Sequence, residues 1–203
     1  MSGWVHHHGP AVALDHANVD TDQIIPARFM STPRAEGYGR FLLHDLRHDA
    51  DGRPDTDMPL NRVSDASVLI AGRNFGTGSS REAAVYALVD FGIRAVIAPS
   101  FGDIFAANAV NNGLLPAQVA EAEDLIAQIG DGAVRATIDL EAGEIKIADR
   151  AMTLDLDPIW LEKLIRGWDD IDLTAAHAPT IAAFRAARAD RQPWTFPAGE
   201  PKR

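Results

Sequence analysis

The stretch SVLIAGRNFGTGSSREAAVYALVDFGIRAVIAPS, residues 67–100, decides the fold of this 203-residue chain. Its first five residues, SVLIA, form a short apolar run that predicts a buried strand. A glycine-containing loop follows. After the loop, Ala84, Ala87, Leu88 and Phe91 recur with helical spacing until Gly92 stops the helix. RAVIA, which comes next, predicts a second strand.

The following residues extend the same pattern. Pro99 and Ser100 open another predicted helix that runs to about Asn112, Gly113 ends it, and LLP at 114–116 begins a third extended run. The order is strand, helix, strand, helix, strand, with crossovers long enough for neighbouring strands to pair in parallel. It predicts an α/β fold built on a parallel sheet.

Shorter patterns flank this unit. AVAL at 11–14 predicts a strand, and residues 133–149 alternate between apolar and polar about a turn at 141–144, as in an antiparallel hairpin. Residues 44–62 are polar and aperiodic, which predicts a surface loop. Residues 158–191 are typical of two helices. We expect one domain over residues 1–203, with a C-terminal helical tail.

Composition limits the classes of function. Hydrophobic residues make up 46% of the chain, and the net charge is −10, from 29 acidic and 19 basic residues. This charge argues against binding to a nucleic-acid backbone, and an anionic substrate would need a local cluster of positive groups. No stretch approaches 18 apolar residues, and residues 1–10 lack the apolar core of a signal peptide. We therefore expect a cytoplasmic location.

Cysteine is absent from the sequence. Disulfide bonds and a thiolate nucleophile are therefore excluded, and this chain cannot ligate an iron–sulfur cluster through cysteine. If its chemistry uses such a cluster, another chain must bring it.

The loop GRNFGTGSSRE at 72–82 is the strongest candidate site. Gly76 and Gly78 permit a tight turn, and a helix expected to begin at Ser79 or Ser80 would offer unpaired N–H groups beside Arg81. These groups together suit a carboxylate or a phosphate. An equally weighted alternative is that Ser79 caps the helix and that the glutamate three residues later completes a capping box. The loop matches neither a P-loop, nor G-x-G-x-x-G, nor G-x-S-x-G.

Two further constellations lie near the N-terminus. NVDTDQIIP at 18–26 is typical of a turn in which aspartates bond to nearby N–H groups, and a lone D-x-D is a weak metal signal. The segment that follows contains Arg28, Arg34 and Arg40, which suit carboxylate binding but equally suit a solvated loop. The histidine run at 6–8 is assigned no function.

Taken together, these motifs resemble those of a known family, the small subunit of 3-isopropylmalate dehydratase in the aconitase superfamily. The matching stretches follow one another in order over nearly the whole chain: NVDTDQIIPARF (18–29), GRNFGTGSSRE (72–82), GIRAVIAPSFGDIF (92–105), NNGLLP (111–116), LIRGWDDIDLT (164–174) and QPW (192–194). The resemblance implies the aconitase swivelling-domain fold, a three-layer β/β/α arrangement with a parallel central sheet.

The resemblance also implies an activity and a partner. The family is a heteromeric hydro-lyase that interconverts 2-isopropylmalate and 3-isopropylmalate by dehydration and rehydration, in leucine biosynthesis. A cysteine-bearing large subunit holds a [4Fe–4S] cluster whose open iron acts as a Lewis acid on the substrate hydroxyl. The small subunit forms a heterodimer with it, closes over the substrate, and supplies the base and the carboxylate contacts.

Site residues carry over by position. Ser79 matches the serine whose alkoxide removes the carbon-bound proton, and Ser80 and Arg81 match the residues that hold a substrate carboxylate. Asp22 matches an acidic active-site residue, and Thr21 is its neighbour in the motif. The resemblance also places Gly76 and Gly78 in the substrate loop. Segment 28–40 aligns with the loop that reads the variable part of the substrate, and either Arg28 or Arg34 is expected to contact a second carboxylate.

One departure from the family pattern stands next to this site. Ala83-Ala84-Val85 replaces the usual His-Ala-Pro after the Ser-Ser-Arg-Glu motif. It leaves open a paralogue that acts on another 2-hydroxy diacid, such as a citramalate-type substrate, or a non-catalytic anion-binding module. A serine hydrolase using Ser79 ranks last, because no free histidine lies in a recognisable motif.

Overall fold

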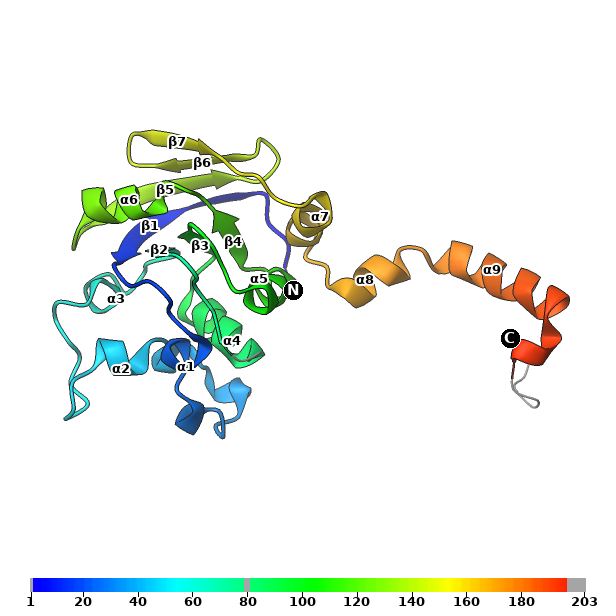
Figure 1. Ribbon diagram of the computed structural model, residues 1–203, viewed down its shortest axis with the longest axis horizontal. Coiled ribbons are helices and arrows are strands. Elements are labelled where there is room, and N and C mark those ends of the chain that lie inside the picture. Colours follow the sequence, from blue (N-terminus) through cyan, green and yellow to red (C-terminus); the bar gives the residue numbers. More distant parts are fainter. Residues whose placement is uncertain (1, 79–80, 197–203) are drawn as a thin grey trace. The chain divides into compact units, whose positions relative to one another are not determined.

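The computed structural model describes residues 2–78 and 81–196 (Figure 1). The chain divides into two compact units, Met1–Trp168 and Asp169–Arg203, each of which is described by itself. A single domain with a helical tail stays a prediction.

The first unit is built on one seven-stranded sheet of order β4-β3-β2-β1-β5-β6-β7. The parallel strands are β1 (His6–Leu14), β2 (Val68–Ala71), β3 (Ala95–Ala98) and β4 (Leu115–Gln118). The antiparallel strands are β5 (Ala133–Asp139), β6 (Glu144–Ile147) and β7 (Arg150–Thr153). In the parallel half, Ala11 aligns with Val68, Val68 with Ala95, and Ala95 with Leu115.

The predicted alternation of strands and helices is confirmed. Helix α4 (Glu82–Phe91) joins β2 to β3, and α5 (Asp103–Asn111) joins β3 to β4. Gly92 ends α4 with φ 113°, a left-handed conformation that glycine adopts without a steric penalty. The predicted hairpin is also present as β5 and β6. Strand β1 begins at His6, earlier than predicted, because β5 pairs with the whole first half of β1.

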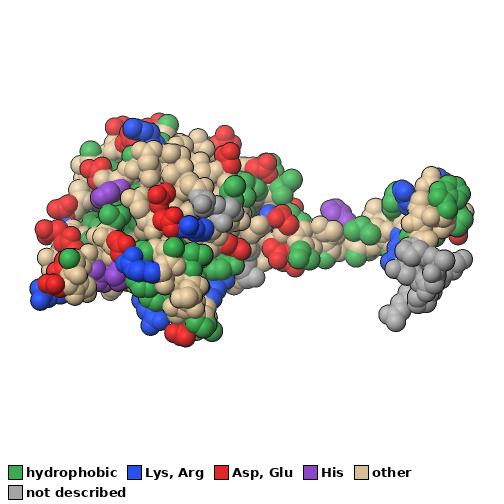
Figure 2. All heavy atoms as spheres, turned by 60° about the horizontal axis from the view of Figure 1, so that its bottom comes forward, with side chains coloured by type: hydrophobic (Ala, Val, Ile, Leu, Met, Phe, Trp, Pro, Cys, Tyr) green, Lys and Arg blue, Asp and Glu red, His purple; other side chains and the backbone are tan. Residues whose placement is uncertain are grey.

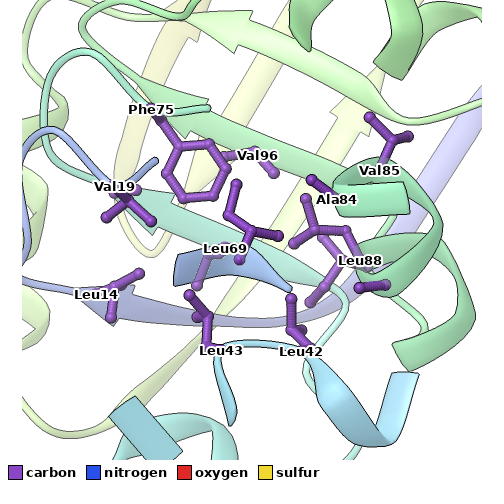
Figure 3. Close-up of a cluster of buried hydrophobic side chains, with 14 of the residues drawn as sticks. Leu14, Val19, Leu42, Leu43, Leu69, Phe75, Ala84, Val85, Leu88 and Val96 are labelled. Carbon is purple, nitrogen blue, oxygen red and sulfur yellow. The ribbon is translucent and has the colours of Figure 1, made fainter. Parts of the chain in front are cut away.

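Both faces of the parallel strands are buried, as expected when successive side chains point to opposite sides. One face packs against α4, α1 (Thr21–Ile24) and residues 38–43. Figure 3 shows this cluster, in which Leu69 and Val96 of the sheet face Leu88 of α4. Each fully buried side chain of this kind contributes about 1.5–3 kcal/mol.

The opposite face packs against α6 (Ala122–Ile129), α7 (Pro158–Arg166) and the inner side chains of β5 and β6. In Figure 1, β6 and β7 lie at the top and α1, α2 and α4 lie at the bottom. This arrangement confirms the predicted three-layer α/β fold. Its small β layer continues the main sheet, because β1 pairs with both β2 and β5.

Residues 44–62 are not the bare surface loop that was predicted. They contain α2 (His44–Arg47) and α3 (Pro59–Arg62), and they bury Met58 and Leu60. Each helix is a single turn, which is too short to show helical periodicity. The segment before them forms three short 3-10 turns, at Ala27–Phe29, Arg34–Glu36 and Gly39–Phe41.

The tail contains three helices where two were predicted. Gly167 ends α7 in a left-handed conformation, and Asp169 starts α8 (Asp170–Ala175) with a capping box. Helix α9 (Ala178–Arg191) and the 3-10 turn Pro193–Thr195 complete the second unit. Among the described residues, no helix is long and apolar enough to cross a membrane.

Candidate active site

Three loops meet at the carboxyl ends of β1, β2 and β3. The Thr21 N–H donates to the carbonyl of Thr77 at 3.0 Å, and the Gly76 N–H donates to the carbonyl of Val19 at 2.8 Å. On the other side, the Gly102 N–H donates to the carbonyl of Phe75 at 2.9 Å. The glycine loop is therefore held between its two neighbours at the edge where α/β proteins bind ligands.

Glycine is required at two points of this junction. Gly76 has φ 73°, and a Cβ added there would collide with the Phe105 ring. A Cβ on Gly102 would lie 2.6 Å from the carbonyl oxygen of Gly76. The loops after β2 and β3 thus touch through backbone atoms, which fixes the start of α5 against the glycine loop.

A cavity of about 250 Å³ opens at this junction. The residues that line it are Thr21, Gly76, Thr77, Gly78, Arg81, Gly102, Asp103, Ile104 and Phe105. It brings together four of the predicted site residues from two distant segments of the chain. Ser79 and Ser80, the predicted base and its neighbour, lie outside the described residues.

Arg81 is the positive group of this cavity. Its Nη1 atom is buried and forms an ion pair with the carboxylate of Asp22, without the directed geometry of a hydrogen bond. The Arg81 side chain is 24% exposed and that of Asp22 is 52% exposed. Asp22 does not itself line the cavity, but its carboxylate is bound to Arg81, which does.

Within the described residues, helix α4 begins at Glu82, with Arg81 at the N-cap position, and the predicted start at Ser79 or Ser80 lies outside these residues. Glu82 is the first residue of the helix, so it cannot be the third helical residue that a capping box requires. Its carboxylate instead accepts a hydrogen bond from the Asn112 side chain at 2.9 Å. Glu82 therefore does not hold the capping-box position that was predicted for it, and capping by Ser79 itself lies outside the described residues.

The turn at 18–26 serves two purposes. The Gln23 N–H donates to Asp20 Oδ1 at 2.8 Å, and the Asp20 N–H donates to Gln23 Oε1 at 2.9 Å, which caps α1. The expected local capping is thus confirmed for Asp20. Asp22 differs, because its carboxylate pairs with Arg81.

Arg28 is held away from the cavity lining by an acidic partner. Its guanidinium contacts both carboxylate oxygens of Asp45, with Nη1 donating to Oδ2 at 2.9 Å, and it lies 4.5 Å from the centre of the Phe29 ring. The hydrogen bond from Arg28 lowers the pKa of Asp45 to about 2.

Arg34 is held by helix α4. Its guanidinium lies 3.5 Å from the centre of the Tyr86 ring and 3.6 Å from Asp90 Oδ1. Burial, followed by a hydrogen bond with Glu82, raises the pKa of Tyr86. Neither Arg28 nor Arg34 is among the residues that line the cavity, so a second carboxylate contact from either one stays a prediction.

Sequence reasoning did not assign Thr77, Gly102, Asp103, Ile104 and Phe105 to the site. Four of them lie in the SFGDIF motif, directly after β3. The rule that ligands bind at the carboxyl ends of parallel strands could have found them, because β3 neighbours β2.

The family departure at Ala83-Ala84-Val85 belongs to the protein core. The three residues are 9%, 0% and 0% exposed, and they pack in the cluster between α4 and the sheet. They do not line the cavity. The three residues that replace His-Ala-Pro therefore take part in packing and not in the described lining of the site.

A second cavity, of about 500 Å³, lies elsewhere on the first unit. The residues that line it include Asp15, Asp55, Asp57, Glu123 and Asp131, and they include no lysine or arginine. Such a lining repels anions, so the larger volume does not make it the better site for a dianionic substrate.

No group of three metal-ligating side chains occurs in residues 2–78 and 81–196, and the chain has no cysteine. These residues do not fit an iron–sulfur cluster.

Comparison with protein families identifies two matching regions. The model of the aconitase C-terminal domain matches residues 1–122. The model of the C-terminal domain of the 3-isopropylmalate dehydratase small subunit matches residues 170–198.

Individual relatives agree with these matches. The 3-isopropylmalate dehydratase small subunit of Caulobacter vibrioides (strain NA1000 / CB15N) is 46% identical over 192 residues, which cover 92% of this chain and 95% of that one. The protein of the same name from Bacillus subtilis (strain 168) is 43% identical and covers 90% and 94% of the two chains. The crystal structure of 3-isopropylmalate dehydratase from Methanocaldococcus jannaschii is 34% identical, with a TM-score of 0.59 over 78% of this chain and 87% of that one. The chain therefore belongs to the family of 3-isopropylmalate dehydratase small subunits.

Proposed function

We propose that this chain is the small subunit of a hydro-lyase that interconverts 2-isopropylmalate and 3-isopropylmalate in leucine biosynthesis, and that it acts with a large subunit. The observation that carries the proposal is the cavity at the carboxyl ends of β1 to β3, where Thr21, the glycine loop and Arg81 meet. The names of the relatives do not favour a citramalate-type substrate.

Arg81 binds one carboxylate of the substrate. Its planar guanidinium can grip a carboxylate with two parallel hydrogen bonds, and its present partner is also a carboxylate, that of Asp22. The chain as a whole carries a charge of −10, and acidic and basic side chains are interspersed over the face drawn in Figure 2. Attraction of the dianionic substrate therefore depends on a local positive group such as Arg81 and not on the electrostatic field of the protein's net charge.

Ser79 removes the proton from the carbon next to the hydroxyl-bearing carbon, and Ser80 shares the carboxylate with Arg81. The positions in the family motif support this assignment. Dehydration releases that proton and the hydroxyl as water, and rehydration returns them with their positions exchanged. A serine is a weak base unless its anion is stabilised, and the guanidinium of Arg81, two residues away in sequence, is suited to stabilise it.

Asp22 orients Arg81. The ion pair between them holds the guanidinium at the cavity while the substrate is absent. We infer that the [4Fe–4S] cluster belongs to the large subunit, because this chain has no cysteine to ligate one. The residues of this chain supply carboxylate binding, orientation and proton transfer.

The test is reconstitution. The purified chain is mixed with an anaerobically reconstituted large subunit of the family, and the conversion of 2-isopropylmalate to 3-isopropylmalate is measured. Activity should require both proteins, and the isolated chain should show no cluster absorbance. Robust isomerisation by this chain alone would refute the proposal, as would inactivity of a mixture in which a relative's small subunit works.

A further inference from the structure

Ile104 is an unusual residue for the wall of a carboxylate site. It is the second residue of α5, it is 54% exposed, and it lines the same cavity as Thr21 and Arg81. The described first unit exposes two other large apolar side chains, Met30 and Ile159, and neither lines this cavity.

The position of Ile104 is fixed by its neighbours. Gly102, two residues earlier, is hydrogen-bonded to Phe75 and has no room for a side chain. Phe105, the next residue, is 3% exposed and packs edge-to-face against Phe75 at 5.4 Å between ring centres. Phe105 is thus packed against Phe75, and Ile104, the residue before it, stays exposed at the cavity that both residues line.

The cavity therefore presents two kinds of surface. Arg81, at the start of α4, offers a positive charge, and α5 offers the apolar side chains of Ile104 and Phe105 next to the carboxylate of Asp103. A hydroxy diacid with a short branched alkyl group matches both surfaces. Its carboxylate pairs with Arg81, and its alkyl group is removed from water when it packs against Ile104.

We propose that Ile104 is a specificity-determining residue that contacts the isopropyl group of the substrate. This inference rests on the proposed function, since it takes the substrate class from there. The family resemblance assigns substrate discrimination to the segment at 28–40. Ile104 would be a second specificity element, contributed by α5.

The test compares two substrates in the reconstituted complex. Citramalate carries a methyl group where 2-isopropylmalate carries the isopropyl group. Ile104→Ala should lower kcat/KM for 2-isopropylmalate about tenfold or more, mainly through KM, because one methylene group in an apolar pocket already discriminates by about 10–200-fold. The kcat/KM of citramalate, or its inhibition constant where turnover is slow, should change less than about twofold.

Ile159→Ala is the matched control. Ile159 is 57% exposed on α7, and its replacement should leave the ratio of the two substrates unchanged. A thermal melt of the isolated chain should show both variants folded, because both side chains are largely exposed.

Two results would overturn the inference. One is an unchanged substrate ratio in Ile104→Ala. The other is a raised Kd for the large subunit with the ratio still unchanged, which would assign Ile104 to the subunit interface. Failure of the proposed function is a separate result, because the wild-type complex would then not convert 2-isopropylmalate at all.

Discussion

Arg81, at the start of α4, forms an ion pair with Asp22 of α1, so two segments separated by about 60 residues of sequence meet at one charge pair. The pair stands beside the cavity that Arg81 lines. A substrate carboxylate that enters this cavity meets a guanidinium already directed by a carboxylate, which favours exchange of one anion for another.

Replacement of Ser79 tests the proton-transfer role. Ser79→Ala in the reconstituted complex should lower kcat by at least about 10²–10⁴-fold, because the base is lost. KM and the melting temperature should change little. Retained turnover together with a loss of about 1 kcal/mol in the free energy of unfolding would indicate a purely structural role instead.

Gly76 should tolerate no side chain. Gly76→Ala combines a positive φ with a collision against the Phe105 ring, so we expect a loss of about 2–5 kcal/mol in the free energy of unfolding. Gly37→Ala is the control, because Gly37 has φ 81° but no atom within 4 Å of the added Cβ, and it should lose about 1–2 kcal/mol. Urea unfolding of both variants measures the difference. Equal losses would contradict the packing of Phe105 under the loop.

Asp45 should titrate at low pH. The hydrogen bond from Arg28 lowers its pKa to about 2, from an ordinary value of 3.8. Because the folded-state pKa lies below that of the unfolded chain, the pair stabilises the fold above about pH 4, and this contribution is lost as the pH falls through about 2.

Carboxyl chemical shifts measured by NMR check this titration. Arg28→Ala should return the Asp45 midpoint toward about 3.9, whereas Arg53→Ala, which removes an exposed arginine paired with Asp51, should not move it. A midpoint near 4 in the wild-type protein would show that Arg28 does not bind Asp45 in solution.

The elements from Val68 to Gln118 follow from sequence because each has its own clear period or boundary. β2 and β3 are short apolar runs, and Gly92 ends α4 where a left-handed residue is needed. The one-turn helices α2 and α3 could not be predicted, since four residues carry no measurable period. In the tail, Asp169 starts a helix within a stretch that was expected to be a break.

The site was predictable only in part, because some of its residues are brought in by contacts between segments far apart in sequence. Thr21, Gly76, Gly78 and Arg81 stand out through motif and resemblance, and the cavity does bring them together. Ile104 and Asp103 join them because β3 lies beside β2 and its loop is bonded to Phe75. The partners of Arg28 and Arg34, which are Asp45 and Tyr86, likewise depend on contacts between segments far apart in sequence.

The central claim is that the cavity at Arg81 is the substrate site, and the kinetics of Arg81→Lys in the reconstituted complex test it most directly. Lysine keeps the charge but loses the planar guanidinium, so KM for 2-isopropylmalate should rise clearly. The kcat should also fall, because a misplaced substrate no longer presents its carbon-bound proton to Ser79. Arg53→Lys, in an exposed pair with Asp51, is the control and should behave as wild type. Wild-type KM and kcat in Arg81→Lys, with a stability change of only about 0–1 kcal/mol, would contradict the account.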